Sequence, residues 1–316
     1  MVTATEAQHP AAVIEKLLVD PASHTIFPPL AMRVLTMASD PKASGKDLKE
    51  VIEVDPGLAT RILKMANSAY YGIRQPVRSV ERAVVMLGFG KVKAMVIGFV
   101  LSSTGKTEGL TFPEYGNFWR YAGAVACSAR SVADRFAPNQ REDAYLLGLI
   151  HEMGVLLMRD SLGKVYDDVL AEAVSQQRCL YEVEKQRLGI THAAAAKVVF
   201  EKWGFPPAQY APIAHHHSDR ISKVFGREEN LMFRILRVAV YLGLLFENDQ
   251  QRALYANKAF ETARAEFRTE LEDMRAIISN TAVEYRKLVQ FLTGLEASAD
   301  EFDAAAEKAR QVLAAA

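Results

Sequence analysis

Apolar residues recur every three or four positions along most of this chain, and this spacing constrains the fold more than any other feature of the sequence. One clear case is the face formed by Leu58, Ile62, Met65 and Ala69. Such a face repeats with the 3.6-residue period of an α-helix. We find no convincing run in which apolar and polar residues alternate with the two-residue period of a half-buried strand. The sequence therefore predicts an all-α protein, built as a multi-helix bundle.

Local start and stop signals divide this pattern into separate helices. Asp55 is placed to accept hydrogen bonds from the free amides of a helix start, and Pro56 fits the first turn, where no amide hydrogen is needed. The helix is expected to end near Gly72, ahead of Pro76. A tight break at residues 88–90, Gly-Phe-Gly, separates the next two predicted helices.

Longer helices are predicted downstream. They cover about residues 114–136, 142–158 and 231–246. The second of them contains His151 and Glu152. The third is apolar nearly all round, which predicts that it is buried.

The stretch 102–111 contains two glycines and has the composition of a linker, so we expect a subdomain boundary there. The resulting division is an N-terminal helical subdomain at residues 1–108, a second helical subdomain at 109–219, and C-terminal helices at 220–316 that pack on the other two.

The size and charge of the chain restrict its function. Its 316 residues are 50% hydrophobic, which is enough to bury a substantial core. Lys plus Arg and Asp plus Glu both number 38, so no overall charge draws the protein toward nucleic acid, and nucleic-acid binding has little support. The cysteines, Cys127 and Cys179, form no CxxC pair and are typical of a reduced, cytosolic setting.

The sequence also argues against a membrane protein. Its first residues carry neither a basic cluster nor a long apolar run, so no secretory signal is expected. The most hydrophobic window, residues 83–101, has Lys91 and Lys93 at its centre, which argues against a membrane span. We expect a soluble, cytoplasmic protein with no membrane partner.

Two motifs carry a resemblance to a known family. Residues 55–89 read DPGLATRILKMANSAYYGIRQPVRSVERAVVMLGF, and residues 148–152 read GLIHE. Together they resemble an HDOD domain, a bacterial signalling module related to the HD-domain metal phosphohydrolases. The resemblance extends from about Pro21 to Asp219. It implies an HDOD/HD-like helical bundle across the first two subdomains, with the C-terminal helices appended.

The resemblance implies that key metal ligands are altered. In HD phosphohydrolases an early His, a His-Asp pair, further His residues and a late Asp hold one or two metal ions that activate water. In this chain Tyr121 stands at the early His, and His151-Glu152 stands at the His-Asp pair. Val240 stands at the late Asp. A neutral phenol is a poor ligand for ordinary divalent metals, and valine cannot ligate at all.

Other candidate ligands remain downstream. His192 matches a Gly-x-x-His pattern, and His216 and His217 match an Ile-x-x-His-His pattern, with His215 replacing His217 if the register shifts by one. The residual metal candidates are therefore His151, Glu152, His192, His216 and His217. No catalytic residue is assigned and no cofactor is expected, except a divalent metal if these residues still form a site.

Each of these residues also has a purely structural interpretation. A single histidine on an apolar helix, such as His151, is more often a hydrogen-bonded core residue than a ligand. The three consecutive histidines at 215–217 suit a polar helix end. His192 could hydrogen-bond locally near a helix start, and Asn67 is best explained as satisfying backbone groups at the end of its helix.

The resemblance favours a non-catalytic regulatory module of signal transduction. Such a module would act by binding other signalling proteins, with a small ligand as a further option. Formation of a homo-oligomer stays open. The alternative function is a metal-dependent phosphohydrolase of nucleotides or cyclic dinucleotides with an altered HD site.

Overall fold

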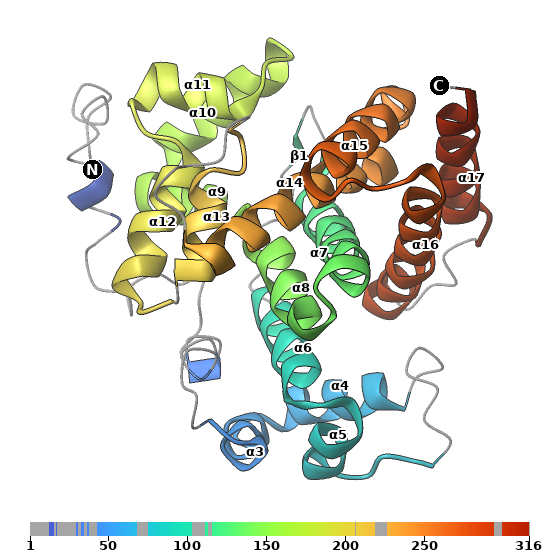
Figure 1. Cartoon of the computed structure of the whole chain (residues 1–316). Helices are drawn as coiled ribbons and strands as arrows, with labels where there is room; N and C mark the ends of the chain where they lie inside the picture. Colours follow the sequence, from blue (N-terminus) through green and yellow to red (C-terminus); the bar gives the residue numbers. More distant parts are fainter. Residues whose placement is uncertain are drawn as a thin grey trace.

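The computed structural model describes residues 13–15, 17, 30, 33–34, 37, 43–67, 75–102, 111–112, 116–205, 207–218, 226–293 and 299–315. Helices make up most of this part of the chain, so the predicted all-α class is confirmed. In Figure 1 the helices near residues 45–102 lie at the bottom, the helices near 150–215 at the upper left, and the C-terminal helices at the right.

The lower part contains four helices. They are α3 (Gly45–Glu53), α4 (Pro56–Ala66), α5 (Val80–Leu87) and α6 (Phe89–Ser102). Asp55 caps α4 as predicted, since its carboxylate accepts hydrogen bonds from the backbone of Gly57 at 2.9 Å and of Leu58 at 3.1 Å. Gly88 separates α5 from α6 with a φ of 90°, a backbone conformation that favours glycine.

Asn67 has the structural role that the sequence indicated. Its side-chain amide donates to the carbonyls of Leu63 at 2.8 Å and Val77 at 2.7 Å, and its side-chain oxygen accepts from the Val77 amide at 2.7 Å. Asn67 therefore joins the end of α4 to the segment before α5.

The middle of the chain supplies the long central helix and the helices at the upper left of Figure 1. They are α7 (Phe118–Phe136), α8 (Arg141–Ile150), α9 (Met153–Leu162), α10 (Lys164–Ser175), α11 (Leu180–Leu188), α12 (His192–Lys202) and α13 (Pro207–Ala214). A 3-10 turn, η3 (Pro138–Gln140), joins α7 to α8. These two helices approach closely because a Cβ at Gly148 would lie only 2.8 Å from the Cα of Ala126.

The described C-terminal part of the chain forms four helices, two of which pack on α7. They are α14 (Arg227–Glu247), α15 (Arg252–Phe267), α16 (Leu271–Thr293) and α17 (Ala299–Ala315). Both α14 and α16 pack on α7. The buried carboxylate of Glu247 on α14 accepts hydrogen bonds from Tyr285 Oη at 2.6 Å and from Arg120 Nε at 3.1 Å. These bonds tie α16 and α7 to α14.

The prediction of one helix over residues 142–158 is wrong. The structure has two helices, α8 and α9, and places His151 and Glu152 in the turn between them. The ring Nδ1 of His151 lies 2.7 Å from the Gly148 carbonyl, which a continuous helix would use for its backbone ladder. The break turns both side chains toward α12 and α13.

A small strand pair adds to the helical prediction. Strands β1 (Thr111–Phe112) and β2 (Gly116–Asn117) pair antiparallel directly before α7. Most of the linker that we predicted at 102–111 lies outside the described residues. Within the part that the structure describes, no helix has both the length and the apolar character needed to cross a membrane.

Candidate metal centre

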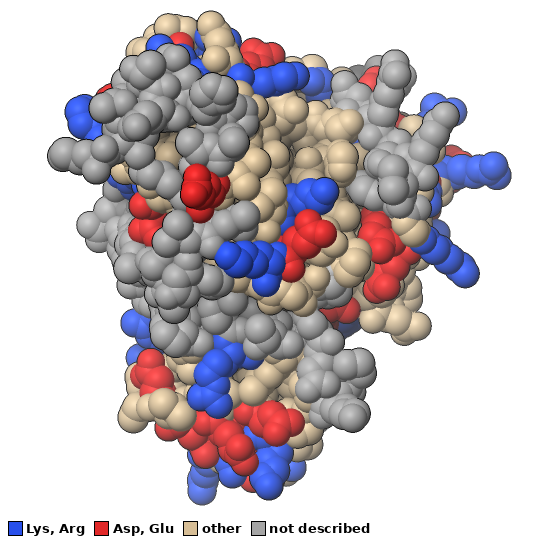
Figure 2. Space-filling view, turned by 90° about the vertical axis from the view of Figure 1, so that its left-hand side faces the viewer, with Lys and Arg blue, Asp and Glu red and all other residues tan. Residues whose placement is uncertain are grey.

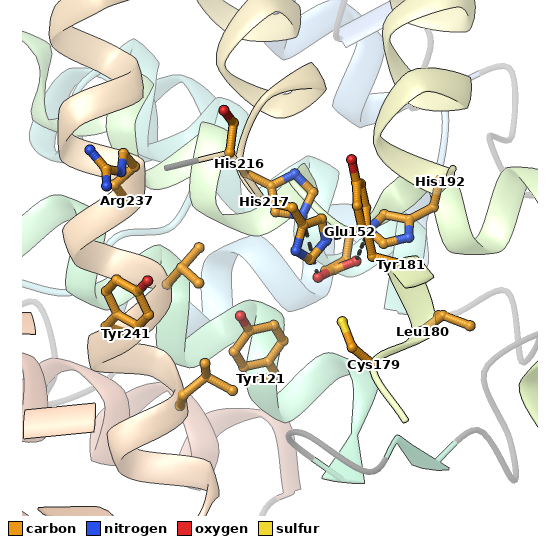
Figure 3. Close-up of a pocket in the computed structure, with 13 residues that line it drawn as sticks. Tyr121, Glu152, Cys179, Leu180, Tyr181, His192, His216, His217, Arg237 and Tyr241 are labelled. Carbon is orange, nitrogen blue, oxygen red and sulfur yellow. Dashed lines mark hydrogen bonds and ion pairs between the residues drawn. The ribbon is translucent and has the colours of Figure 1, made fainter. Parts of the chain in front are cut away.

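A pocket of about 190 Å³ lies between α7, α11, α14 and the turns that follow α8 and α13. Glu152, His192, His216 and His217 line one side of it. Figure 3 shows the carboxylate of Glu152 between the rings of these three histidines. The pocket thus brings together residues that are far apart in the sequence.

The four side chains form a compact ligand cluster. One nitrogen or oxygen atom from each lies within 4.8 Å of the corresponding atoms of the others. His192 Nε2 lies 3.2 Å from Glu152 Oε2 and 2.9 Å from His217 Nε2. His216 Nε2 lies 3.6 Å from Glu152 Oε1. This arrangement resembles a set of ligands that converge on one ion.

His151 lies beside this cluster. Its Nε2 is 3.7 Å from Glu152 Oε1, and its ring packs edge-on against His216 with 5.3 Å between centroids. The structure therefore brings together all five candidates from the sequence, with four in the compact cluster. His215 is half-buried and lies outside this cluster, so the geometry favours His216 and His217 as the matching pair.

The second ring nitrogen of each buried histidine is anchored. Nδ1 of His151 lies 2.7 Å from the Gly148 carbonyl, and Nδ1 of His216 lies 2.6 Å from the Ile213 carbonyl. A carbonyl only accepts hydrogen bonds, so each Nδ1 carries the proton. In the neutral ring, Nε2 then directs a lone pair toward Glu152. This is the orientation that metal-bound histidines adopt.

Several buried polar atoms in this region lack a hydrogen-bond partner within the described residues. They are His151 Nε2, Glu152 Oε2 and His216 Nε2. Lone pairs that face a carboxylate repel it unless a proton or a cation lies between them. Imidazole and carboxylate groups together suit divalent ions such as Zn²⁺, Fe²⁺, Ni²⁺ and Mn²⁺. The residues present therefore fit a divalent metal ion.

The electrostatics of the site also favour a cation. Burial alone raises the pKa of Glu152, but His192, His216 and His151 hold it well below its usual value. Burial lowers the pKa of His151 to about 4, although Glu152 opposes this shift. The pKa of His217 is also well below its usual value, because of desolvation and nearby His216 and His192. At neutral pH the site combines a charged carboxylate with neutral imidazoles at positions 151 and 217.

His217 differs from the other members of the cluster in its exposure. As a whole residue it is exposed, unlike the other three members of the cluster. Its ring Nε2 nevertheless contacts His192, and its ring packs against Tyr181 with 4.7 Å between centroids. The ring environment, and not the exposure of the residue as a whole, governs its titration.

The opposite wall of the pocket offers few metal ligands. Tyr121 lies on α7, and its ring is 5.3 Å from that of His151. Val240 lies on α14, is half-buried and lines the same pocket, as do Tyr241 and Leu244. The residues at the early-His and late-Asp positions thus reach the site, and they present a phenol and an isopropyl group.

Sequence reasoning missed further site residues. Glu184 on α11 is fully buried, and its Oε2 lies 2.7 Å from Nδ1 of His192. The signal was available, because Glu184 occupies the same helical stripe as Leu180 and Leu188, four residues to either side. A carboxylate in an apolar stripe requires a buried partner. Tyr181 and Arg237, which also line the pocket, had no comparable signal.

Comparison with known proteins identifies the family. The family model described as the HDOD domain matches residues 25–219, more than half of the chain. This protein belongs to the HDOD family. A curated relative, an uncharacterised protein from Treponema pallidum (strain Nichols), is 19% identical over 193 residues. That match covers 61% of this chain but 37% of the relative, so this HDOD chain spans little more than a third of its length.

Solved structures share the fold of this HDOD protein. An HDOD domain protein of unknown function from Geobacter sulfurreducens superposes with a TM-score of 0.66 at 18% identity, covering 94% of this chain and 98% of the other. A candidate phosphohydrolase from Shewanella amazonensis SB2B gives a TM-score of 0.61 at 21% identity, with coverage of 88% and 98%. A protein from Marinobacter aquaeolei VT8, named as a candidate signal transduction protein, gives a TM-score of 0.59 at 24% identity. This match covers 90% of this chain and 69% of the other. At these identities the likeness concerns the fold.

Proposed function

We propose that this HDOD protein is a non-catalytic regulatory module of signal transduction, which acts by binding other signalling proteins in the cytoplasm. The main support is the wall of the pocket formed by α7 and α14. It presents Tyr121 and Val240 where HD phosphohydrolases carry ligands. The name of the Marinobacter aquaeolei VT8 protein also supports a role in signalling.

The surface and the cysteines are consistent with this proposal. On the face shown in Figure 2, the acidic and basic side chains of the described residues are interspersed, and these residues form no continuous basic surface for a phosphate backbone. Within the described residues, Cys127 and Cys179 form no disulfide, which is compatible with a reducing compartment. We propose that residues 1–108, 109–219 and 220–316 act as the units of the module, and formation of a homo-oligomer is compatible with this proposal.

We further propose that the cluster of Glu152, His192, His216 and His217 holds one divalent metal ion. The support is the convergence of four ligand atoms, together with the buried atoms that lack a hydrogen-bond partner within the described residues: Glu152 Oε2 and His216 Nε2 in the cluster, and His151 Nε2 beside it. When bound, the ion would supply a positive charge and coordination bonds linking the α8–α9 turn to the start of α12 and the end of α13. The protein would hold this ion as a structural or regulatory cross-link, because the residues at 121 and 240 add no ligand.

The alternative is a metal-dependent phosphohydrolase of nucleotides or cyclic dinucleotides. It is favoured by the same four ligands and by the fold shared with the Shewanella amazonensis protein. In this case the ion would activate water beside the phosphoester. In this alternative, an ion held by only one carboxylate and three imidazoles would have to support hydrolysis.

One experiment separates the two functions. Full-length protein is loaded in turn with Mn²⁺, Fe²⁺, Ni²⁺, Zn²⁺ and Mg²⁺ and assayed with bis(p-nitrophenyl) phosphate, nucleotides and cyclic dinucleotides. The regulatory proposal predicts no turnover above that of a Glu152→Gln variant. Metal-dependent hydrolysis that the variant loses would establish the alternative.

The binding role needs its own measurement. Proteins that co-purify with the full-length chain from its native cytoplasm are identified, produced separately and titrated against it by calorimetry. The proposal predicts a saturable complex with at least one signalling protein. It is overturned if no purified candidate binds.

A further inference from the structure

A second buried group stands behind the metal cluster. Tyr166 on α10, Glu184 on α11 and His192 on α12 are 0%, 0% and 2% exposed. The Tyr166 hydroxyl donates a hydrogen bond to Glu184 Oε1. Glu184 Oε2 accepts a bond from the backbone amide of His192 at 2.8 Å and lies 2.7 Å from His192 Nδ1. Three donors from two neighbouring helices therefore converge on one carboxylate.

The position of His192 in its helix explains why it needs such a partner. His151 and His216 each use a backbone carbonyl three residues earlier, in the turn that precedes them. His192 is the first residue of α12 and has no preceding helical turn. Glu184 takes the place of that carbonyl for the ring and also satisfies the free backbone amide of His192.

The main chain of His192 is fixed from the opposite side. Gly154 on α9 lies so close that a Cβ there would overlap the carbonyl oxygen of His192. Gly154 is two residues after Glu152, so the start of α9 lies next to both Glu152 and the backbone of His192. The backbone of His192 is held by α9, while its ring is held by Glu184.

Tyr166 holds Glu184 in turn. Burial and the neighbouring Glu184 carboxylate raise the pKa of the Tyr166 phenol well above its usual value, so the phenol remains a donor. With Oε1 bound to Tyr166, Oε2 is left for the ring and amide of His192. A carboxylate has only acceptor atoms, so Nδ1 of His192 must be the donor.

We propose that Glu184 is a positioning residue, which fixes the Nδ1–H tautomer and the ring orientation of His192 so that Nε2 is presented to a divalent cation beside Glu152. Tyr166 keeps Glu184 in place for this task. The consequence for cation affinity rests on the metal site proposed above, whereas the tautomer and ring orientation do not depend on it. If Glu184 were only structural, it would accept a hydrogen bond from the amide at the start of α12 and would not affect the ring of His192.

The tautomer can be read directly in the metal-free, full-length protein. Long-range proton–nitrogen spectra of histidine-labelled protein distinguish protonated from unprotonated ring nitrogens, and a His192→Gln variant assigns the signals. The wild type is expected to show Nδ1–H and an unprotonated Nε2 at His192. Glu184→Leu is expected to lose this fixed tautomer, and Glu184→Gln to retain it, because the amide oxygen still accepts.

The cation affinity provides the second measurement. Titration of metal-free protein with Zn²⁺ or Mn²⁺ is expected to show binding that is about 10- to 100-fold weaker in Glu184→Leu. Tyr166→Phe is expected to weaken it several-fold. Glu172→Gln is the matched control, because Glu172 lies on α10 but pairs with Arg178 and Arg187. This control should bind the cation as the wild type does.

The outcomes are separable. If Nε2 of His192 carries a proton in the metal-free wild type, alone or together with Nδ1, or if folded Glu184→Leu keeps the wild-type tautomer, the positioning role of Glu184 is excluded. If Glu184→Leu does not fold, the tautomer and affinity of Tyr166→Phe decide the question, and wild-type values for both overturn the proposal. A wild type that shows the expected tautomer but binds no cation removes the metal site and leaves the positioning of His192 established.

Discussion

Nε2 of His192 lies 3.2 Å from Oε2 of Glu152, and this pair joins the start of α12 to the turn between α8 and α9. The two residues are far apart in the sequence, so local chain geometry does not bring them together. When the ring of His192 is neutral and its Nδ1–H is bonded to Glu184, Nε2 directs a lone pair at a carboxylate oxygen of Glu152. A cation between them would convert this repulsion into two favourable contacts.

Glu152→Gln is therefore expected to weaken the binding of Zn²⁺ or Mn²⁺ by more than about tenfold, because it removes the only carboxylate of the cluster. Cation at about 100 times its Kd should stabilise the wild type by about 2.7 kcal/mol, measured as a rise in Tm. The variant should show little of this rise at the same concentration. His215→Ala serves as the control, because His215 lies outside the cluster, and an equal loss in this control would contradict the assignment.

The metal-free protein is expected to lose stability as the pH falls from about 6.5 to about 4. The pKa of His151 is lowered by burial to about 4, against 6.5 for an ordinary histidine. Below pH 6.5 the unfolded chain gains a proton that the folded chain does not accept, so unfolding becomes more favourable until the folded form also titrates. The shift corresponds to a loss of about 3 kcal/mol across this range.

Urea unfolding of chelator-treated protein at several pH values measures this dependence. His151→Gln removes the titrating group and should flatten the slope of unfolding free energy between pH 6.5 and 4. The pKa of His217 is lowered in the same direction, so part of the slope should remain. An unchanged slope in His151→Gln would show that His151 titrates normally in the folded protein.

Gly154→Ala is expected to destabilise the fold by about 1–3 kcal/mol, because the new methyl group would overlap the carbonyl oxygen of His192. Gly98→Ala is the matched control. Its Cβ would lie 3.6 Å from Leu149 Cδ2, an ordinary contact, and alanine is the better helix former. Urea midpoints should therefore fall for Gly154→Ala and stay level or rise for Gly98→Ala. If the two variants changed the urea midpoint equally, the close contact between α9 and the backbone of His192 would be contradicted.

Features that depend on neighbouring residues in the chain could be predicted from the sequence. Asp55 caps the helix that it precedes, Gly88 separates two helices, and Asn67 satisfies a backbone carbonyl at the end of its helix. Each of these roles uses backbone groups within about ten residues. The family resemblance added the five candidate ligands, which the structure brings together.

Features that depend on distant packing could not be predicted in the same way. The periodicity of residues 142–158 is helical throughout, and the break at His151 arises where buried side chains meet α12 and α13. The buried position of Glu184 was signalled by its apolar stripe, but its partners lie on two other helices. Helical spacing shows which face is buried without showing what it contacts.

Restoring the two altered positions tests how far the site has departed from a hydrolase. Tyr121 and Val240 line the pocket from α7 and α14, facing the cluster. In the double variant Tyr121→His/Val240→Asp, an imidazole and a carboxylate would replace the phenol and the isopropyl group. The expected result is a rise in bound Mn²⁺ from one to two ions per chain, measured by elemental analysis. Folding is checked by Tm, with Leu244→Met as a control for altering the same wall. Two ions in the double variant, with one in the wild type, would show that residues 121 and 240 limit the site, whereas a stoichiometry of one in both proteins would contradict this assignment.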